Sequence, residues 1–431
     1  MPVREKRYSI FLFIGILLLY RLSLDYIYTY IISPVFEYSH FVLSFSAPFY
    51  ALVFAWFIII TIYDYKLFID NRPSSNLLFF IDVFYFIPFT SMASLAGFNP
   101  SFVLFGFIFW VLMSGIQLAE VSKKRNDAKV NGVLAPSSLF FTIAWIIVII
   151  NTIITIYYNG FHIKFDLSDV YDLRSAMRDL QMPGLVGYIK PWASKVTIIL
   201  LLLYLERKHW AYVGVLSVIQ LMNFAFGGLK GDLFTLLVAF VVGLFYINSR
   251  KRFILYALLL LNGVVLLEYS LTGISTVSIL IHRRMLFMPC LLSSEYFTFF
   301  SSHELVVFRD SFLRWFGVEN PYHIGIPYLI GAEFYDAPEM GANTGIIGDD
   351  FAQLGWLSLL IFPLLRVKAL NWGIDKARAF MSDKLCILIC FMFAFSFISG
   401  SFFSILLTGG YIIITLLLLS MKKGKKTQDE A

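Results

Sequence analysis

The sequence predicts an all-α polytopic membrane protein with about twelve transmembrane helices and a large folded extracytoplasmic loop. Hydrophobic residues make up 59% of the chain and charged residues only 14%, whereas about 25% of the residues in a soluble domain are charged. The hydrophobic residues gather in stretches that approach the ~20 residues a helix needs to cross ~30 Å of hydrocarbon. The connections are alternately rich and poor in Lys and Arg, as in proteins that cross the bilayer repeatedly.

Each apolar stretch is expected to form one membrane-spanning helix. Most connections are short and polar, but two are long, at residues 159–193 and 271–350. We therefore expect a single membrane domain, residues 1–431, that ends in a polar tail at 421–431. The twelve expected spans are residues 8–32, 39–63, 77–96, 100–118, 138–158, 194–205, 211–226, 232–248, 253–270, 351–365, 384–400 and 402–420.

The distribution of basic residues predicts the orientation, because Lys and Arg are retained on the cytoplasmic side. Most of the 34 basic residues fall in connections that share a side with the amino terminus, including the segment that holds Arg366 and Lys368. Both termini and the tail are therefore expected in the cytoplasm, and the two long loops outside. The net charge of +6 suits anionic lipid headgroups and requires no nucleic acid. The first apolar stretch lacks a small-residue cleavage site and is expected to be a retained signal anchor.

Few ionisable groups lie within the spans. Arg21 and Asp25 are one helical turn apart and are expected to neutralise each other, whereas Asp82 and Glu268 have no partner nearby in the sequence. The three cysteines are too few and too scattered for a disulfide framework or a metal site. We expect neither a metal nor another cofactor.

The outward loop at 159–193 contains apolar residues at helical spacing between 167 and 180, which predicts an amphipathic helix lying in the membrane interface. Arg174 and Arg178 are one turn apart on it, so both could reach one anionic phosphate. A lid or packing helix without a binding role is the alternative.

The second outward loop, 271–350, is far longer than a connection needs, and such loops are usually functional or disordered. Its aromatic content favours a folded cap. Ser301 and Glu304 form a capping box that predicts a helix ending at Gly317. The loop also carries Arg283 and Arg284, either as interfacial anchors or as a binding site for an anion.

Two further outward segments carry candidate residues. The turn GGLKGD, residues 227–232, places Lys230 among glycines that allow close approach to an anion, although a tight turn explains the glycines equally well. The run before the tenth span combines carboxylates with a histidine, the groups used for general-base catalysis; solvated side chains, or Asp349 and Asp350 as helix caps, are the alternatives. The candidate bases are His323, Glu333, Asp336 and Asp349.

The order of these features resembles the Wzy-type polymerases, which join lipid-linked repeat units of O-antigen or capsular polysaccharide at the outer face of the bacterial inner membrane. The resemblance rests on GGLKGD, on HRRMLFMPCLLSSEYFTFF at 282–300, and on GANTGIIGDDFAQLGWLSLL at 341–360. It implies a GT-C-like, metal-independent glycosyltransferase that uses an undecaprenyl-pyrophosphate-linked donor. Lys230, Arg283 and Arg284 match the family's pyrophosphate-binding positions, although the family often has Arg where this chain has Lys230.

On this interpretation, fixed cations stabilise the leaving pyrophosphate without Mg²⁺, and one of the candidate bases deprotonates the acceptor hydroxyl. Aromatic side chains of the cap can stack on sugar faces. The expected partners are lipid-linked glycans and the bilayer, with a chain-length regulator and a flippase as further candidates. Residues expected to contact substrate are Arg309, Tyr322, Tyr328, Phe334, Tyr335 and Asn343.

Three alternatives remain open from the sequence. An O-antigen ligase shares the layout of a large outward loop. A lipid-linked oligosaccharide flippase or transporter is also polytopic, but transporters place their sites at broken helices in repeated halves. A scaffold of an assembly complex would not need clustered Arg, His and carboxylate residues.

Overall fold

A computed structural model of the chain describes residues 9–70, 72–123, 136–159, 184–227, 230–246, 252–311, 313 and 316–421. These residues are all-helical, and their one β-type pairing is an isolated bridge between Ser44 and Ala96. The chain forms two compact units. The first comprises residues 1–125, 251–369 and 394–402, and the second residues 126–250, 370–393 and 403–431.

Nine helices in the described part of the chain are long and apolar enough to cross a membrane. The prediction of a helical multi-pass protein is confirmed, but twelve spans of full length are not. The seventh and eighth predicted spans are shorter apolar helices, Trp210–Ala225 and Gly231–Phe245, and the eleventh is a helix of 17 residues. The nine are Ile10–Ser39, Ala47–Ile69, Pro73–Leu95, Pro100–Ser122, Ser138–Tyr158, Gly184–Glu206, Phe253–Thr272, Gly348–Phe380 and Phe402–Leu419.

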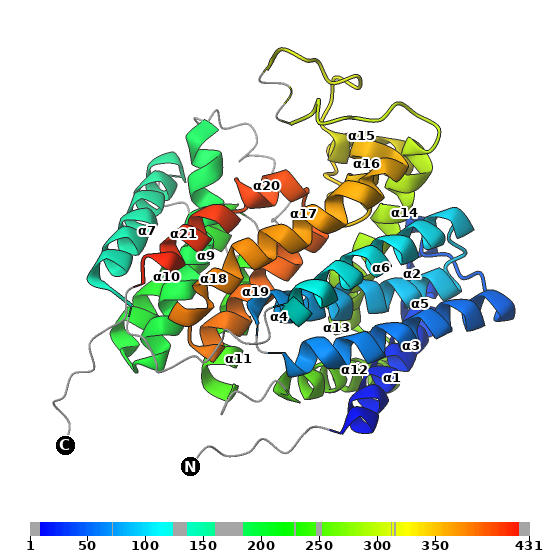
Figure 1. The fold of residues 1–431 in the computed structure, drawn as a ribbon, viewed down its shortest axis with the longest axis horizontal. Coiled ribbons are helices and arrows are strands. Elements are labelled where there is room, and N and C mark those ends of the chain that lie inside the picture. The colour runs from blue at the N-terminus through cyan, green and yellow to red at the C-terminus, as the bar shows by residue number, and fades with distance from the viewer. Residues whose placement is uncertain are drawn as a thin grey trace. The chain divides into compact units, whose positions relative to one another are not determined.

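The first unit contains most of the long helices (Figure 1). Several of its membrane-length helices are composite, because short π-helical or 3-10 segments interrupt them. Its elements are α1 (Ile10–Ile27), η1 (Tyr28–Ile32), α2 (Ser33–Phe36), η2 (Glu37–Ser39), α3 (Ala47–Ile69), α4 (Pro73–Ile81), η3 (Asp82–Phe86), α5 (Ile87–Leu95), α6 (Pro100–Lys123), α12 (Arg252–Thr272), α13 (Thr276–Ser278), η4 (Ile279–Phe287), α14 (Met288–Phe300), α15 (Ile326–Tyr335), α16 (Gly348–Leu354), η6 (Gly355–Leu357) and α17 (Ser358–Trp372).

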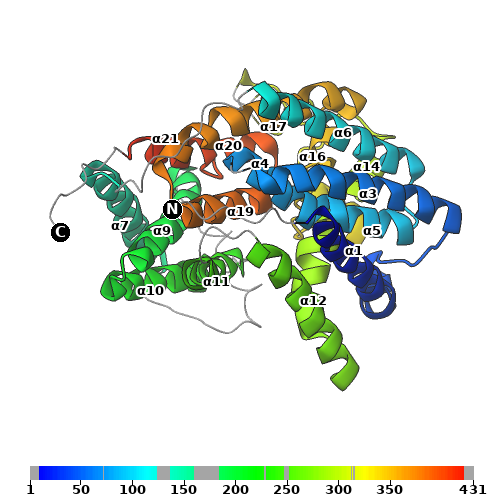
Figure 2. The same ribbon diagram turned by 60° about the horizontal axis from the view of Figure 1, so that its bottom comes forward.

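The helix formed by α4, η3 and α5 is the centre of this unit. Nearly all of its side chains are buried, because α3, α1 and α14 pack around it. α1 also packs against α12, and these two helices lie side by side in both views (Figures 1 and 2). A helix that is apolar all round and enclosed by other helices is the expected core of a large helical protein.

The segment 271–350 is not a simple surface loop. Residues 276–300 form one helical stretch, α13 to α14, and most side chains of α14 are buried. The helix predicted after the capping box of Ser301 and Glu304 is absent, because the described residues between 301 and 317 form turns. Val307 and Phe308 have positive φ angles of 50° and 60°, which is incompatible with an α-helix.

The chain approaching α16 is strained. Ile347 has φ 71° and ψ −62°, and the Gly348 N–H donates to the Ile346 carbonyl at 3.0 Å, so the three residues form a γ-turn of the rare, strained type. Gly355 then interrupts the helix with φ 55°. The tenth predicted span, 351–365, is consequently divided between α16 and α17.

The second unit is a smaller group of helices in which α9 packs against α7, α10 and α11. α9 begins at Gly184 rather than at residue 194, and contains Pro191. The predicted amphipathic helix with Arg174 and Arg178 lies outside the described residues. The elements are α7 (Ser138–Asn159), α9 (Gly184–Glu206), α10 (Trp210–Gly227), α11 (Lys230–Phe245), α18 (Ile374–Ala377), η7 (Arg378–Phe380), α20 (Phe402–Leu406) and α21 (Tyr411–Leu419), with α19 (Asp383–Ser399) beginning here and ending in the first unit.

Candidate functional site

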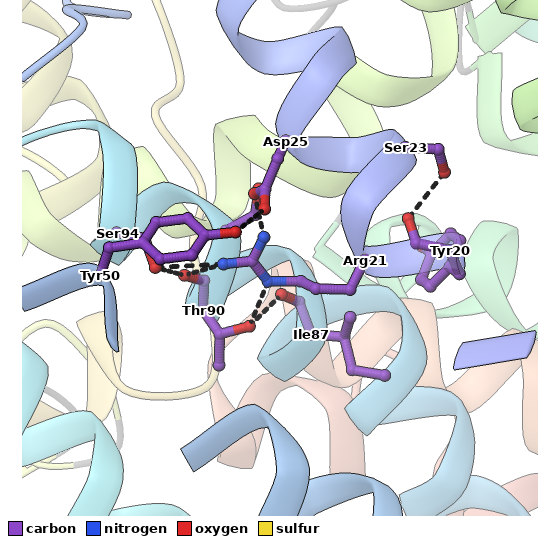
Figure 3. A network of polar contacts seen from close by, with 9 residues as sticks. Tyr20, Arg21, Ser23, Asp25, Tyr50, Ile87, Thr90 and Ser94 are labelled. Carbon is purple, nitrogen blue, oxygen red and sulfur yellow. Dashed lines mark hydrogen bonds and ion pairs between the residues drawn. The ribbon is translucent and has the colours of Figure 1, made fainter. Parts of the chain in front are cut away.

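Arg21 and Asp25 form the buried ion pair that their spacing predicts, and this prediction is confirmed (Figure 3). The Arg21 Nε donates to the Thr90 hydroxyl at 2.9 Å, and an Nη donates to the Thr90 carbonyl at 2.8 Å. Asp25 accepts a hydrogen bond from the Tyr50 hydroxyl at 2.8 Å. These bonds join α1, α3 and α5, so the pair is explained by its role in holding the helices together.

A second buried pair joins α16 to α17. Arg366 donates to both carboxylate oxygens of Asp350, from one Nη at 2.6 and 2.7 Å, and both side chains are almost completely inaccessible to solvent. Arg366 was expected in a connection after the tenth span, but it is buried in the membrane-length helix Gly348–Phe380. A bidentate Arg–carboxylate pair satisfies the geometry that a buried ion pair requires.

The glycines of GANTGIIGDD are explained by close packing. A Cβ atom on Gly345 would lie 2.2 Å from the Phe397 carbonyl oxygen, and one on Gly348 would lie 3.0 Å from the Ser293 Cα. The Ser293 hydroxyl contacts that of Thr344 at 2.9 Å. Gly345 and Gly348 therefore allow the close packing of the segment that leads to Asp349 and Asp350. No bound ligand is needed to account for these two glycines.

The most chemically capable cluster surrounds Glu295 on α14. One carboxylate oxygen, Oε1, contacts the His40 Nδ1 at 2.9 Å and accepts a hydrogen bond from the Tyr335 hydroxyl at 2.9 Å. The His40 ring stacks on that of Tyr335, with centroids 5.3 Å apart. Arg283 lies beside the segment 36–41, which carries His40. Its guanidinium carbon is 3.9 Å from the centroid of the Phe36 ring. We define these five residues as the Glu295 cluster.

Burial raises the proton affinity of Glu295. Its side chain is 6% exposed, whereas His40 is 44% exposed. Burial raises the pKa of Glu295, and the hydrogen bonds from His40 and Tyr335 oppose the rise. The other carboxylate oxygen, Oε2, is buried and has no hydrogen-bond partner among the described residues. A buried polar atom without a partner is rare and requires an explanation.

The positive charge of Arg283 interacts with the Tyr335 phenol of the cluster. Burial and the neighbouring Glu295 raise the pKa of the Tyr335 phenol, whereas Arg283 lowers it. A cation and a carboxyl group with a raised pKa are thus held on the same helical stretch, η4 to α14. Such a combination is typical of sites that transfer a proton and stabilise negative charge.

The structure brings only some of the predicted site residues together. Arg283 and Tyr335 belong to the Glu295 cluster, and Phe334 lies next to it, with its ring centroid 6.3 Å from that of His40. Asp349 is buried close to Asp350 and Arg366. Arg284, His323, Glu333, Asp336 and Asn343 are exposed.

The other predicted residues make contacts within the segment from α14 to α15, or have side chains outside the described residues. Arg309 pairs with Glu304 at 2.7 Å and donates to the Val306 carbonyl. The Tyr322 hydroxyl donates to the Glu304 carbonyl at 2.5 Å. Tyr328, on α15, packs beside Gly325 and Gly341. Lys230 begins α11 in the second unit, but its side chain, like Arg174 and Arg178, is outside the described residues.

Sequence reasoning missed Glu295 and His40. They are 255 residues apart, so no spacing rule connects them. The one available signal was an acidic residue in the apolar stretch 286–300, where an unpaired charge is costly. His40 has a positive φ of 65°, which the sequence alone does not reveal.

The chain matches no protein-family model, no curated protein and no solved structure. Within the described residues, no group of three or more His, Cys, Asp or Glu side chains could hold a metal ion. Any function must therefore be argued from the chemistry of the residues described above.

Proposed function

We propose that this protein is a membrane glycosyltransferase that polymerises oligosaccharide repeat units carried on undecaprenyl pyrophosphate, as in O-antigen or capsular polysaccharide synthesis at the outer face of the bacterial inner membrane. The observation that carries the proposal is the Glu295 cluster. It places a buried carboxylate with an unpartnered oxygen against the Tyr335 hydroxyl, and the Tyr335 phenol also interacts with the cation of Arg283. Long apolar helices supply the surroundings that a polyprenyl tail requires.

In the proposed reaction, Glu295 is the general base. Its Oε2 accepts the proton of an acceptor hydroxyl as that oxygen attacks the anomeric carbon of the donor. The bond from the anomeric carbon to the pyrophosphate oxygen breaks, and its electron pair leaves with the pyrophosphate. The half-exposed His40 then links the protonated carboxyl to solvent through Oε1.

Arg283 and Arg284 are proposed to stabilise the pyrophosphate. Arg283 packs against the Phe36 ring, and this cation–π contact orients its guanidinium group. Arg284 is exposed and follows it directly in the chain. Preorganised cations next to a developing negative charge lower the barrier without any reorganisation during the reaction.

Aromatic rings at the cluster suit a sugar ligand. Tyr335, Phe334 and His40 stack on one another or meet at their edges, and Phe36 and Phe41 lie near the Arg283 guanidinium. Flat apolar rings with polar edges can pack against the faces of a sugar while leaving its hydroxyls to hydrogen-bond.

The packing of the first unit also supports a site on one side of the membrane. The loop after η2, which the charge rule assigns outside, pairs with the α5–α6 connection through a Ser44 N–H to Leu95 carbonyl bond of 2.7 Å. The same loop carries His40 of the cluster. At the other helix ends, Arg72 donates to the Glu120 carbonyl at 3.3 Å. Segments expected on the same side thus lie together.

The test is deletion of the gene followed by complementation and gel analysis of surface glycan. A deletion strain that carries one repeat unit on the final carrier indicates a polymerase. Long lipid-linked chains that never reach the final carrier indicate a ligase, and intermediates held on the inner leaflet indicate a flippase; either result refutes the proposal.

Substitution of the cations gives the matched comparison. Arg283→Ala and Arg284→Ala should each abolish long-chain glycan while the protein remains inserted and expressed. Lys66→Ala is the control, because Lys66 is an exposed basic residue near the end of α3 away from the cluster. Wild-type chain length in both arginine variants would remove these residues from the donor site.

A further inference from the structure

Two acidic side chains meet inside the membrane-length helices of the first unit. Asp64 lies on α3 and Asp82 begins η3, and their exposed fractions are 0% and 1%. Their carboxyl groups lie within hydrogen-bonding reach of each other. At 1.5 Å per residue, Asp64 is about 8 Å from the end of α3 at Ile69, and Asp82 is about 14 Å from the start of α4.

No ion pair with a basic residue of the described segments neutralises this pair. The Trp110 Nε1 donates to the Asp82 Oδ1 at 3.0 Å, but the Asp82 Oδ2 and both oxygens of Asp64 have no hydrogen-bond partner within the described chain. None of the ion pairs among those residues includes either acid. Asp25, in contrast, forms an ion pair with the buried Arg21.

Two buried hydroxyls face the acids. The Tyr63 hydroxyl lies close to Ser114 and interacts with both Asp82 and Asp64. Neither the Tyr63 nor the Ser114 oxygen makes a complete hydrogen bond with the residues that the structure describes. Asp82 also begins a π-helical segment, and π-helical interruptions are frequent at functional sites because they redirect side chains.

We propose that Asp64 and Asp82 form a proton-binding site within the membrane, in which the Asp64 carboxylic acid donates a hydrogen bond to the Asp82 carboxylate. Two adjacent carboxylates in a low-dielectric interior cannot both be ionised. Asp82 is assigned as the carboxylate because the Trp110 N–H stabilises its charge. Among the described residues, the other ionisable group that interacts with the pair is the Tyr63 phenol, which is not a cation.

Hydrogen-bonded polar side chains also lie near the end of α3 and the start of α4. Gln117, one turn beyond Ser114 on α6, donates to the Ser74 hydroxyl at 3.0 Å, and Ser75 donates to Asp70 at 2.6 Å. These groups lie on α4 and α6, where most other side chains are apolar.

The test uses dicyclohexylcarbodiimide, an apolar reagent that modifies carboxyl groups only when they are protonated. The purified full-length protein in detergent is treated near neutral pH and analysed by peptide mass spectrometry. We expect modification of Asp64 or Asp82 and none of Asp25 or Asp350, which are the comparison acids because each forms an ion pair with a buried arginine. Asp64→Asn combined with Asp82→Asn should abolish the labelling.

A spectroscopic measurement keeps the result independent of reagent access. The infrared spectrum of the wild type minus that of the double Asn variant should contain the carbonyl stretch of a protonated carboxylic acid. Absence of both the label and this band would overturn the proposal. Protection from the label by sodium chloride, but not by choline chloride, would replace the proton with a sodium ion and would equally refute it. Neither readout depends on glycan synthesis.

Discussion

Replacing Glu295 by Gln tests the proposed chemistry most directly, because Gln preserves the shape of the side chain. The amide oxygen can take the place of Oε1 and accept the bonds that His40 and Tyr335 make at 2.9 Å. The amide nitrogen then occupies the position of Oε2, which has no partner among the described residues. The variant should therefore fold normally while losing its ability to accept a proton.

The expected loss follows from the role of a general base. Positioned proton transfer contributes about 10² to 10⁴ in rate, so Glu295→Gln should raise the activation barrier by about 3 to 5 kcal/mol. The pH profile supplies a second signature. Burial raises the pKa of Glu295, and the base must be deprotonated, so activity is lost as pH falls through this raised pKa. The loss begins at a higher pH than for a solvent-exposed glutamate, and Gln should abolish this acidic limb.

The assay is polymerisation of lipid-linked repeat units by the purified protein, with products resolved by gel and rates compared across pH. Glu333→Gln is the matched control, because Glu333 lies on α15 near Tyr335 in sequence but is exposed. A Glu295→Gln variant that keeps the wild-type rate and the wild-type acidic limb would refute the assignment of Glu295 as the base.

Three other outcomes are expected from the structure. Asp350→Asn should lower the free energy of unfolding in detergent by about 3 to 5 kcal/mol, because Arg366 is left buried and unpaired. Replacing both residues by apolar ones should lower the free energy of unfolding much less. Equal losses in the two variants would contradict this account. Gly345→Ala should prevent folded protein from accumulating, since its Cβ would lie 2.2 Å from a backbone carbonyl oxygen. A normally folded variant would contradict this prediction and show that the backbone can move to accept the Cβ. A reporter fused after Ser302 should be external and one after Lys251 cytoplasmic, and the reverse would overturn the orientation on which the glycan proposal rests.

The helices were predictable from the sequence because burial in lipid and burial in protein both require long apolar stretches. Their ends were less predictable. α9 begins at Gly184 and accommodates Lys190 and Pro191 within the helix, whereas the predicted span, residues 194–205, began after them. The division between α16 and α17 depends on the positive φ of Gly355, and glycine is equally compatible with a continuous helix.

The candidate site was predictable only in part. Arg283 and Tyr335 were found because charged and aromatic residues in a long loop are conspicuous. The exposed acids Glu333 and Asp336 have the same residue types, but burial, which decides chemical character, is not visible in the chain. Glu295 was overlooked because its surroundings resemble an ordinary apolar helix, and its partners come from distant segments.

The buried acids of the first unit divide into two classes by their partners. Asp25 and Asp350 each face a buried arginine, and their oxygens are used within the fold, so structural roles account for them. Asp82 and Glu295 each retain an oxygen without a partner within the described chain, and leaving such an atom buried costs about 1 to 3 kcal/mol. Apolar residues of similar size would avoid that cost. These acids are therefore explained if the missing hydrogen bond is donated by a sugar hydroxyl at Glu295 and by the protonated carboxyl of Asp64 at Asp82.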